Sequence, residues 1–301
     1  MATKGFRYEG YIILASLLWG TSFVSVKIGV EEIDPFFYSI LRFLFGSLFL
    51  IVVVLAAKSY EPRLFKDRII WGIALVNAVA YNFQHVGISM TTATNAALLI
   101  DINAVFVAIL AVFILGERLN YRIGVGLALG ITGVVVVTTG GDLSTILSGS
   151  FLGNMLVFFS GILWAVYIVY QKKVLMREVN VLMITAVVMI LTTVFLVPMS
   201  LPLASDFSIT DLGMASVVYT GIFCSGLAFI LYNAGLRKVG ATISSIILLL
   251  EIVFAVFFAY LILSEVPTMP VIVGGSLIVL AIAAIALWNN NQVRDSEPEV
   301  D

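Results

Sequence analysis

The sequence predicts an all-α, polytopic membrane protein whose ten transmembrane helices form two inverted five-helix repeats. Composition is the first indication: of 301 residues, 61% are hydrophobic and only 11% are charged, whereas soluble domains are about 25% charged. The second is a series of ten apolar segments, each long enough to cross about 30 Å of hydrocarbon as a helix. The third is that the second half of the chain repeats the first.

The first half holds five of the apolar segments, at residues 9–30, 35–57, 69–88, 92–115 and 121–139. Their apolar and polar residues do not alternate with the period of two that is typical of membrane barrels, so each segment is predicted to be a helix. The first segment is interpreted as a span and not as a cleaved secretory signal, because no small-residue cleavage site follows Val30. In the fifth, Gly126 and Gly130 have the small-xxx-small spacing that favours close helix packing.

The second half holds the other five segments, at residues 151–171, 179–200, 211–236, 240–263 and 268–288. Cys224, in the third of them, is the one cysteine of the chain, which excludes an internal disulfide and favours a small buried hydrophobe. After the last segment the chain becomes polar, and we expect a disordered cytoplasmic tail there. The predicted units are an N-terminal repeat at 1–145, a C-terminal repeat at 146–290 and the tail at 291–301.

Basic residues predict the orientation of the spans. When the connections are assigned alternately to the two sides of the membrane, all 16 Lys and Arg residues except Lys27 and Arg42 fall in one set. The positive-inside rule places that set in the cytoplasm, so both termini are predicted to be cytoplasmic and the count of ten spans is supported. We expect an integral protein of the cytoplasmic (inner) membrane of a prokaryote.

Two alignments define the repeat. The stretch WGTSFVSVK at 19–27 returns as WAVYIVYQK at 164–172, with Trp and Lys in the same places. Residues 87–117 align without a gap on 235–265, and both copies end in a glutamate that we interpret as a helix-end anchor or gate element. Because each copy has five spans, an odd number, the second copy must enter the bilayer from the opposite side. Inverted repeats are typical of secondary transporters, which bind their substrate near the midplane where the repeats meet.

Three motifs suggest a family. They are WGTSFVSVK in the first span, DPFFYSILRF at 34–43 and LGERL at 115–119. With these motifs and the duplicated five-helix unit, nearly the whole chain resembles the EamA-type, ten-helix branch of the drug/metabolite transporter (DMT) superfamily. Members of this family are largely exporters of amino acids and small metabolites, and YddG-like members export aromatic amino acids. The resemblance implies a central cavity walled by the first, third and fourth spans of each repeat.

Two acidic residues, Asp101 and Glu251, lie near the middle of predicted spans, where an ionisable group is a functional candidate because its burial is costly. Each could be a partner for a substrate ammonium group or a proton-coupling carboxylate. The alternative is a neutral acid or a buried pair that joins helices. In the repeat alignment the two are offset by two positions, which rotates a helix by about 200°. We therefore expect that they do not both face the central axis, and we favour Glu251 for the cavity.

Three basic residues have competing interpretations. Arg42 lies about 10 Å inside the second span, counted at helical rise, where it could pair with Asp101 in a structural role. Lys27 is one turn from the end of its span and either snorkels to the interface or contacts a substrate carboxylate. Asp101, Arg42 and Lys27 are therefore grouped as coupling or structural buried charges. We interpret Lys172 as a topology determinant at the cytoplasmic boundary.

The other cavity candidates are aromatic or polar residues on shared helix faces. Trp in mid-membrane lies outside its usual interfacial belt, so Trp19 and Trp164 are assigned to the cavity, although such stripes often only pack. His85 has no companion ligands for a metal and is expected to hydrogen-bond in the cavity. The predicted substrate-binding residues are Trp19, Phe23, Tyr81, His85, Asn95, Trp164, Tyr167, Tyr232 and Glu251.

These features favour a secondary transporter that exports small amphiphilic metabolites, with amino acids, aromatic ones included, as the preferred class. It would work by alternating access around a midplane cavity. The alternative carrier is a sugar-nucleotide or organophosphate antiporter, which should need several cavity cations.

Other classes of function have less support. A membrane-embedded enzyme would need a nucleophile with its base or clustered metal ligands, and a channel would usually have charged rings or filter loops; neither pattern is visible. No catalytic residue, metal or cofactor is predicted. The expected partners are a small-molecule substrate and the lipid bilayer, no nucleic acid is expected, and a monomer is predicted to suffice.

Overall fold

The computed structural model describes residues 3–91, 96, 99–118, 120–140, 142, 150–263 and 268–295. All regular secondary structure in these ranges is helical. The cavity candidate Asn95 and Glu265, the glutamate that ends the second copy of the repeat alignment, lie outside the described residues.

The helices of the first repeat are α1 (Thr3–Glu32), α2 (Pro35–Ala56), the 3-10 helix η1 (Pro62–Lys66), α3 (Arg68–Met90), α5 (Asn103–Leu115) and α6 (Tyr121–Thr139). Side chains that accept hydrogen bonds from free backbone N–H groups fix where several of them begin. Asp34 accepts from Phe36 N at 2.9 Å at the start of α2, and Asn120 accepts from Ile123 N at 2.9 Å at the start of α6. A single capping residue therefore marks the start of each of these two spans.

The helices of the second repeat are α7 (Phe151–Leu175), α8 (Val181–Ser200), α9 (Asp211–Tyr219), the π-helix η3 (Thr220–Leu227), α10 (Ala228–Leu236), α11 (Ala241–Leu248), α12 (Leu250–Leu263) and α13 (Met269–Asp295). The π-helix η3 joins α9 and α10 into one span. Leu249 separates α11 from α12, and its N–H bonds to Ile246 O instead of continuing the α-helical pattern.

Ten helical segments correspond in order to the ten predicted spans. Seven are long and apolar enough to cross a membrane, and three shorter apolar helices, Leu99–Leu115, Ile123–Val136 and Met269–Ala283, occupy the other predicted spans. The predicted all-α membrane architecture is confirmed. One boundary differs: α13 continues to Asp295, into the segment predicted as a polar tail, because Asn and Gln can continue a helix that is already formed.

The repeat is visible as pairs of residues in matching places. At an offset of 146 residues, the N-cap of α2, Asp34, corresponds to Asn180, which caps α8 by accepting from Leu182 N at 2.9 Å. At the same offset Ser47 corresponds to Thr193, and these two hydroxyls hydrogen-bond to each other at 3.0 Å. A contact between a residue and its own counterpart indicates that the pseudo-two-fold axis passes between α2 and α8.

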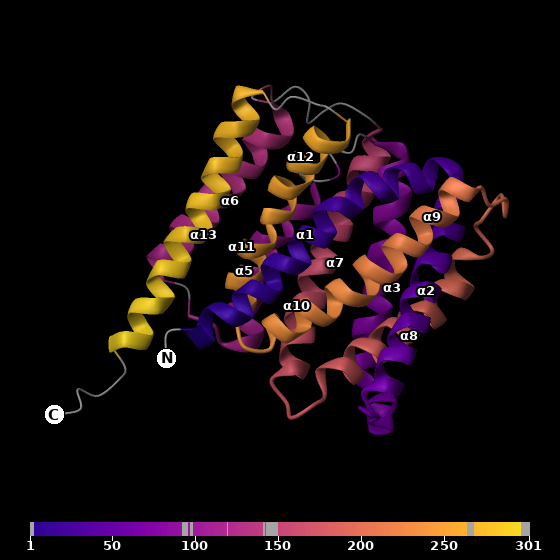
Figure 1. The fold of residues 1–301 in the computed structure, drawn as a ribbon, viewed down its shortest axis with the longest axis horizontal. Helices are drawn as coiled ribbons and strands as arrows, with labels where there is room; N and C mark the ends of the chain where they lie inside the picture. Colours follow the sequence, from indigo (N-terminus) through magenta and orange to yellow (C-terminus); the bar gives the residue numbers. More distant parts are fainter. Residues whose placement is uncertain are drawn as a thin grey trace.

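Helices pack mainly across the two repeats. The pairs α2 with α8 and α6 with α13 each join a helix to its counterpart, and in Figure 1 α6 and α13 run side by side. The pairs α1 with α10 and α3 with α7 are exchanged by the symmetry. The repeats therefore interlock, so the space at their interface is lined by both halves of the chain.

The connections gather on two faces, which we name by the ends of the chain. The terminal face carries the start of α1, the end of α13 and the connections 57–67, 176–180 and 237–240. The distal face carries the turn at 33–34 and the connection 201–210 (Figure 1). In a membrane, these faces correspond to the two aqueous sides.

Candidate functional site

A cavity lies at the centre of the molecule where the repeats meet. The space within it that the centre of a water molecule can reach is about 60 Å³, enough for a few waters. Its lining combines aromatic rings, amides and both signs of charge. The lining residues are Trp19, Ser22, Phe23, Arg42, Tyr81, Gln84, Ile100, Asn103, Trp164, Ile168, Tyr232, Leu248 and Glu251.

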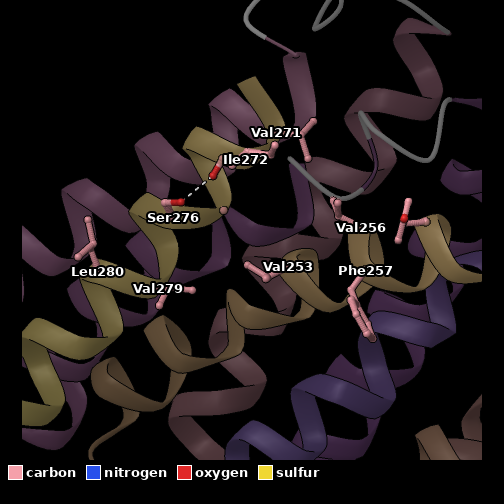
Figure 2. Close-up of a pocket in the computed structure, with 10 residues that line it drawn as sticks. Val253, Val256, Phe257, Val271, Ile272, Ser276, Val279 and Leu280 are labelled. Carbon is pink, nitrogen blue, oxygen red and sulfur yellow. Dashed lines mark hydrogen bonds between the residues drawn. The ribbon is translucent and has the colours of Figure 1, made fainter. Parts of the chain in front are cut away.

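A larger hollow, about 590 Å³, lies at the edge of the molecule between α12 and α13 (Figure 2). Figure 2 shows apolar side chains such as Val253, Phe257 and Leu280 around it, and hydroxyl groups come from Ser276 and from Tyr260. The Ser276 hydroxyl is satisfied by Ile272 O at 2.8 Å. The walls of this groove are mostly apolar, which suits lipid acyl chains.

The first aromatic wall of the cavity is built around Trp19 of α1. Its ring meets Phe229 edge-on at 5.1 Å and Tyr232 at 5.3 Å between centroids, both from α10. The indole Nε1 donates to Cys224 O at 2.9 Å, within the π-helix η3. Cys224 is buried, as predicted. π-Helical turns are often found at functional sites, and this one provides the carbonyl that fixes the indole.

The second wall repeats the first around Trp164 of α7. Its ring meets Tyr81 at 5.0 Å, and its Nε1 donates to Gln84 Oε1 at 3.0 Å, both from α3. At the repeat offset of 148, Tyr81 corresponds to Phe229 and Gln84 to Tyr232. Sequence reasoning did not select Gln84, although its alignment with Tyr232 was a usable signal.

Close helix approach positions the acidic wall. An added Cβ on Gly20 would lie 2.6 Å from Glu251 O and 2.8 Å from Phe254 Cβ, so only glycine lets α1 come this near to α12. The chain also leaves the α-helical pattern beside both acids. Ile102 and Leu249 share nearly the same backbone angles, with ψ of −15°. Discontinuous helices of this kind commonly form transporter sites.

Asp101 and Glu251 interact with each other. Their carboxyl groups lie close enough to influence each other, and Asp101 Oδ2 has no hydrogen-bond partner among the described residues. Glu251, the acid that the sequence favoured for the cavity, lines it, whereas Asp101 is not among the described lining residues.

Arg42 of α2 is 2% exposed and lies on the cavity wall. The sequence suggested that Arg42 could pair with Asp101, but the described residues include no such ion pair. Its Nε donates to Ser225 Oγ at 2.9 Å, and its Nη1 lies 3.3 Å from His85 Nε2. The guanidinium stands 5.1 Å from the centre of the Tyr81 ring, so its described partners are all uncharged side chains.

Of the other predicted site residues that the structure describes, Phe23 lies on the cavity wall, and the rest lie behind or away from it. Tyr167 packs behind Trp164 at 5.2 Å. His85 is fully buried behind Arg42 and bonds to Ser39 Oγ at 2.6 Å. Lys27 lies away from the cavity, where it pairs with Glu31 at 3.2 Å.

Lys172 closes the terminal side of the site. Its ammonium donates to three backbone carbonyls at the end of α10, those of Leu236 (2.8 Å), Arg237 (3.1 Å) and Val239 (2.8 Å). A cation at a helix C-terminus is favourable because the last carbonyls there have no partner in the helix. Lys172 is thus a structural clamp in addition to its predicted place at the membrane boundary.

Glu117, two residues after the end of α5, completes this closure. Its carboxylate accepts from Ala241 N at 2.5 Å, Thr242 N at 3.1 Å and Thr242 Oγ1 at 2.8 Å. It therefore caps the N-terminus of α11, where free N–H groups favour an anion. Together Lys172 and Glu117 hold both sides of the connection 237–240, and we call these contacts the terminal clamp.

The distal side is closed by hydroxyl groups. Tyr38 Oη bonds to Ser216 Oγ at 3.0 Å and to Thr220 Oγ1 at 2.8 Å, and Ser25 Oγ bonds to Ser216 Oγ at 3.1 Å. Thr21 and Tyr219 form a further bond between α1 and α9. These contacts are uncharged, in contrast to the terminal clamp.

Comparison with protein families gives a match over both halves of the chain. Residues 7–139 and 151–287 each match the EamA-like transporter family. A solved crystal structure shares the fold with a TM-score of 0.80 at 18% identity, covering 93% of this chain and 97% of the other.

Two relatives are informative by their names. An uncharacterized transporter of Archaeoglobus fulgidus is 31% identical over 93% of this chain and 96% of its own length. A probable terminal-alkyne amino-acid exporter of Streptantibioticus cattleyicolor is 26% identical, with 92% of each chain covered. The names describe transporters and not enzymes.

Proposed function

The chain belongs to the EamA-like transporter family, and we propose that it exports small amphiphilic metabolites, amino acids foremost, as a secondary transporter working by alternating access. The observation that carries this proposal is the lining of the central cavity. The cavity lies where the repeats meet, which is where inverted-repeat transporters bind substrate. Indole and phenol rings from both repeats surround it, and such walls suit a solute with an apolar or aromatic part.

Amino acids fit the polar part of the same lining. Arg42 supplies a cation and Glu251 an acid on the walls of one cavity. The relative named as a probable amino-acid exporter is consistent with this choice. A sugar-nucleotide or organophosphate antiporter should have several cavity cations, whereas Arg42 is the one cation among the described lining residues. That alternative therefore has less support.

The orientation of the protein in the membrane follows from the charge of the connections. Basic residues lie in the connections of the terminal face, so this face is the cytoplasmic one by the positive-inside rule. The protein would then reside in the cytoplasmic membrane of a prokaryote. We propose that a monomer suffices for this activity.

Counterflow in sealed proteoliposomes tests the carrier function. Vesicles loaded with unlabelled amino acids should take up labelled amino acids faster than empty vesicles. The reason is that a carrier with internal substrate bound returns its binding site to the outside faster than an empty one. Equal uptake with and without internal substrate would indicate a channel, and no uptake of any amino acid would contradict the proposed substrate class.

Two cavity variants test the location of the site. Trp164→Ala removes the contact with Tyr81 and the bond to Gln84, and Glu251→Gln removes a charge without changing size. We expect each to slow counterflow about tenfold or more, corresponding to about 1.4 kcal/mol, while the protein remains inserted and folded. Arg63→Gln, an exposed change in η1, is the control. Unchanged transport in both cavity variants would place the site elsewhere.

A further inference from the structure

The guanidinium of Arg42 is held in place with a free edge. Ser225 bonds to Nε, His85 contacts Nη1 and the ring of Tyr81 lies against the group. The Nη2 atom has no hydrogen-bond partner among the described residues, and no described carboxylate lies within ion-pair distance of Arg42. A buried cation without a counter-charge is costly in the membrane, so its neighbours stabilise an orientation that leaves binding capacity unused.

The partners of Arg42 are themselves fixed. Ser39 lies 2.6 Å from His85 Nδ1, and the His85 ring meets Tyr38 edge-on at 5.4 Å. His85 and Tyr38 are both fully buried. Their packing prevents the guanidinium from turning away, and a pre-oriented group loses less conformational entropy when it binds a ligand.

The repeat shows that packing alone does not require an arginine at this place. At the offset of 146 that relates the caps Asp34 and Asn180, Arg42 corresponds to Val188, which is fully buried in α8. A neighbouring contact has the same type in both halves, a hydroxyl bonded to a nitrogen-bearing side chain. Ser39 bonds to His85 in the first half, and their counterparts Thr185 and Asn233 bond at 2.9 Å in the second. The fold therefore accepts valine at one copy of this position, and the charge at the other copy must serve the cavity.

We propose that Arg42 binds the carboxylate of a zwitterionic substrate whose ammonium group faces Glu251, with Asp101 behind it. This inference rests on the proposed function and specifies which part of the amino acid each wall recognises. Arginine suits a carboxylate because its planar N–H groups can donate two parallel hydrogen bonds. The aromatic walls around Trp19 and Trp164 receive the side chain. A substrate that lacks a free carboxylate leaves Arg42 without a counter-charge and binds weakly.

Binding of paired ligands to the purified wild-type protein tests this proposal without any mutation. The twenty common amino acids are first screened by thermal shift, because a ligand that binds the folded state stabilises it. Each amino acid that binds is then compared with its methyl ester, which keeps the ammonium group and loses the carboxylate. We expect the ester to bind about 10 to 100 times more weakly, the range for a lost hydrogen bond to a charged group.

The Arg42→Gln variant locates the effect. It should weaken binding of the amino acid by a similar factor while binding of the ester changes little, and Arg42→Lys should restore part of the affinity. Arg63→Gln serves as the control for surface charge. Folding of each variant is checked by size-exclusion chromatography, and the acid-to-ester comparison on the wild type stands even where Arg42→Gln does not fold.

The outcomes separate this inference from the proposed function. An ester bound as tightly as its amino acid, or a folded Arg42→Gln variant with unchanged affinity for the amino acid, overturns the role of Arg42 and leaves amino-acid export standing. A wild-type protein that neither binds nor transports any amino acid overturns the proposed substrate class, and with it the carboxylate site.

Discussion

The terminal and distal faces are closed by different contacts, although the repeat gives most residues of one face a counterpart on the other. At the terminal face, Lys172 donates to three carbonyls at the end of α10. Its counterpart Lys27 has no bond to the corresponding end of α3 among the described residues. It pairs instead with Glu31 in its own helix. The two lysines also differ in exposure, since Lys172 is buried whereas Lys27 is half-buried. A shared sequence motif therefore has two conformations in one molecule.

This difference is what alternating access requires of an inverted repeat. In the proposed cycle the two halves exchange conformations, so that a clamp formed on one face is released when the matching clamp forms on the other. Lys27 would then take the place at the end of α3 that Lys172 has at the end of α10. The following expectations break or sharpen this comparison, from the largest effect to the smallest.

Removing the ammonium group of Lys172 should open the terminal face. Lys172→Met eliminates three charge-assisted bonds, and we expect the closed terminal conformation to lose about 2–4 kcal/mol. The measurement is the rate at which a membrane-impermeant maleimide labels Ser244→Cys in a Cys224→Ala background, because Ser244 is fully buried in α11 and its hydroxyl has no partner among the described residues.

The labelling rate should rise at least tenfold, since about 1.4 kcal/mol is a factor of ten. Arg63→Gln in the same background is the control. A rate that matches the control would show that the clamp does not hold the terminal face closed.

Glu117→Gln should have a smaller effect of the same sign. An amide oxygen can still accept from one of the N–H groups at Ala241 and Thr242, but the favourable charge at the start of α11 is lost. We expect about 1–2 kcal/mol, seen as a rise in Ser244→Cys labelling that is smaller than with Lys172→Met. A larger rise than with Lys172→Met would assign the main role in the clamp to the acid.

Lys27→Met should slow transport and leave stability almost unchanged. The exposed pair with Glu31 contributes only about 0.3–0.5 kcal/mol, so the melting temperature should stay within about 1–2 °C. Counterflow should nevertheless slow several-fold, because the distal clamp cannot form. Unaltered counterflow would show that Lys27 only snorkels and that the two lysines are not functional counterparts.

The distal hydroxyl contacts should have the smallest effect. Tyr38→Phe removes the bonds to Ser216 and Thr220 but keeps the ring, and neutral hydrogen bonds contribute about 1 kcal/mol each. Those two hydroxyls also retain other acceptors, Ser25 O and Ser216 O. We expect labelling from the distal face at Ser22→Cys, in the Cys224→Ala background, to rise only two- to fivefold. A rise as large as that for Lys172→Met would make the hydroxyl contacts the stronger closure.

Much of the candidate site could be predicted from the sequence. Trp19, Trp164 and Glu251 were selected from mid-membrane position and repeat symmetry, and the structure places all three around one cavity. Both signals come from the chain itself, because span depth follows from hydrophobic length and counterparts follow from alignment. Gln84 was missed although it aligns with the selected Tyr232, and its bond to Trp164 became apparent only in the structure.

The contacts of buried charges could not be predicted. The two-residue offset suggested that Asp101 and Glu251 would not both face the axis, and of the two only Glu251 is a described lining residue, but the alignment could not show that the two carboxyl groups lie near each other. Arg42 was expected near Asp101 by depth alone, whereas Ser225 and His85 hold it. Depth along a span is a one-dimensional quantity, and contact between charges depends on rotation and on neighbouring helices.

The sequence by itself determined the ten spans, their division into two copies and the inversion of one copy against the other. These follow from the thickness of the hydrocarbon layer and from the odd number of spans in each copy. Only the tertiary structure decided which lysine of the repeated motif clamps a helix end, and which walls of the cavity carry the cation and the acids. Those outcomes depend on side-chain contacts between segments more than 60 residues apart, such as Lys172 with Leu236, and two copies of one pattern can satisfy them in different ways.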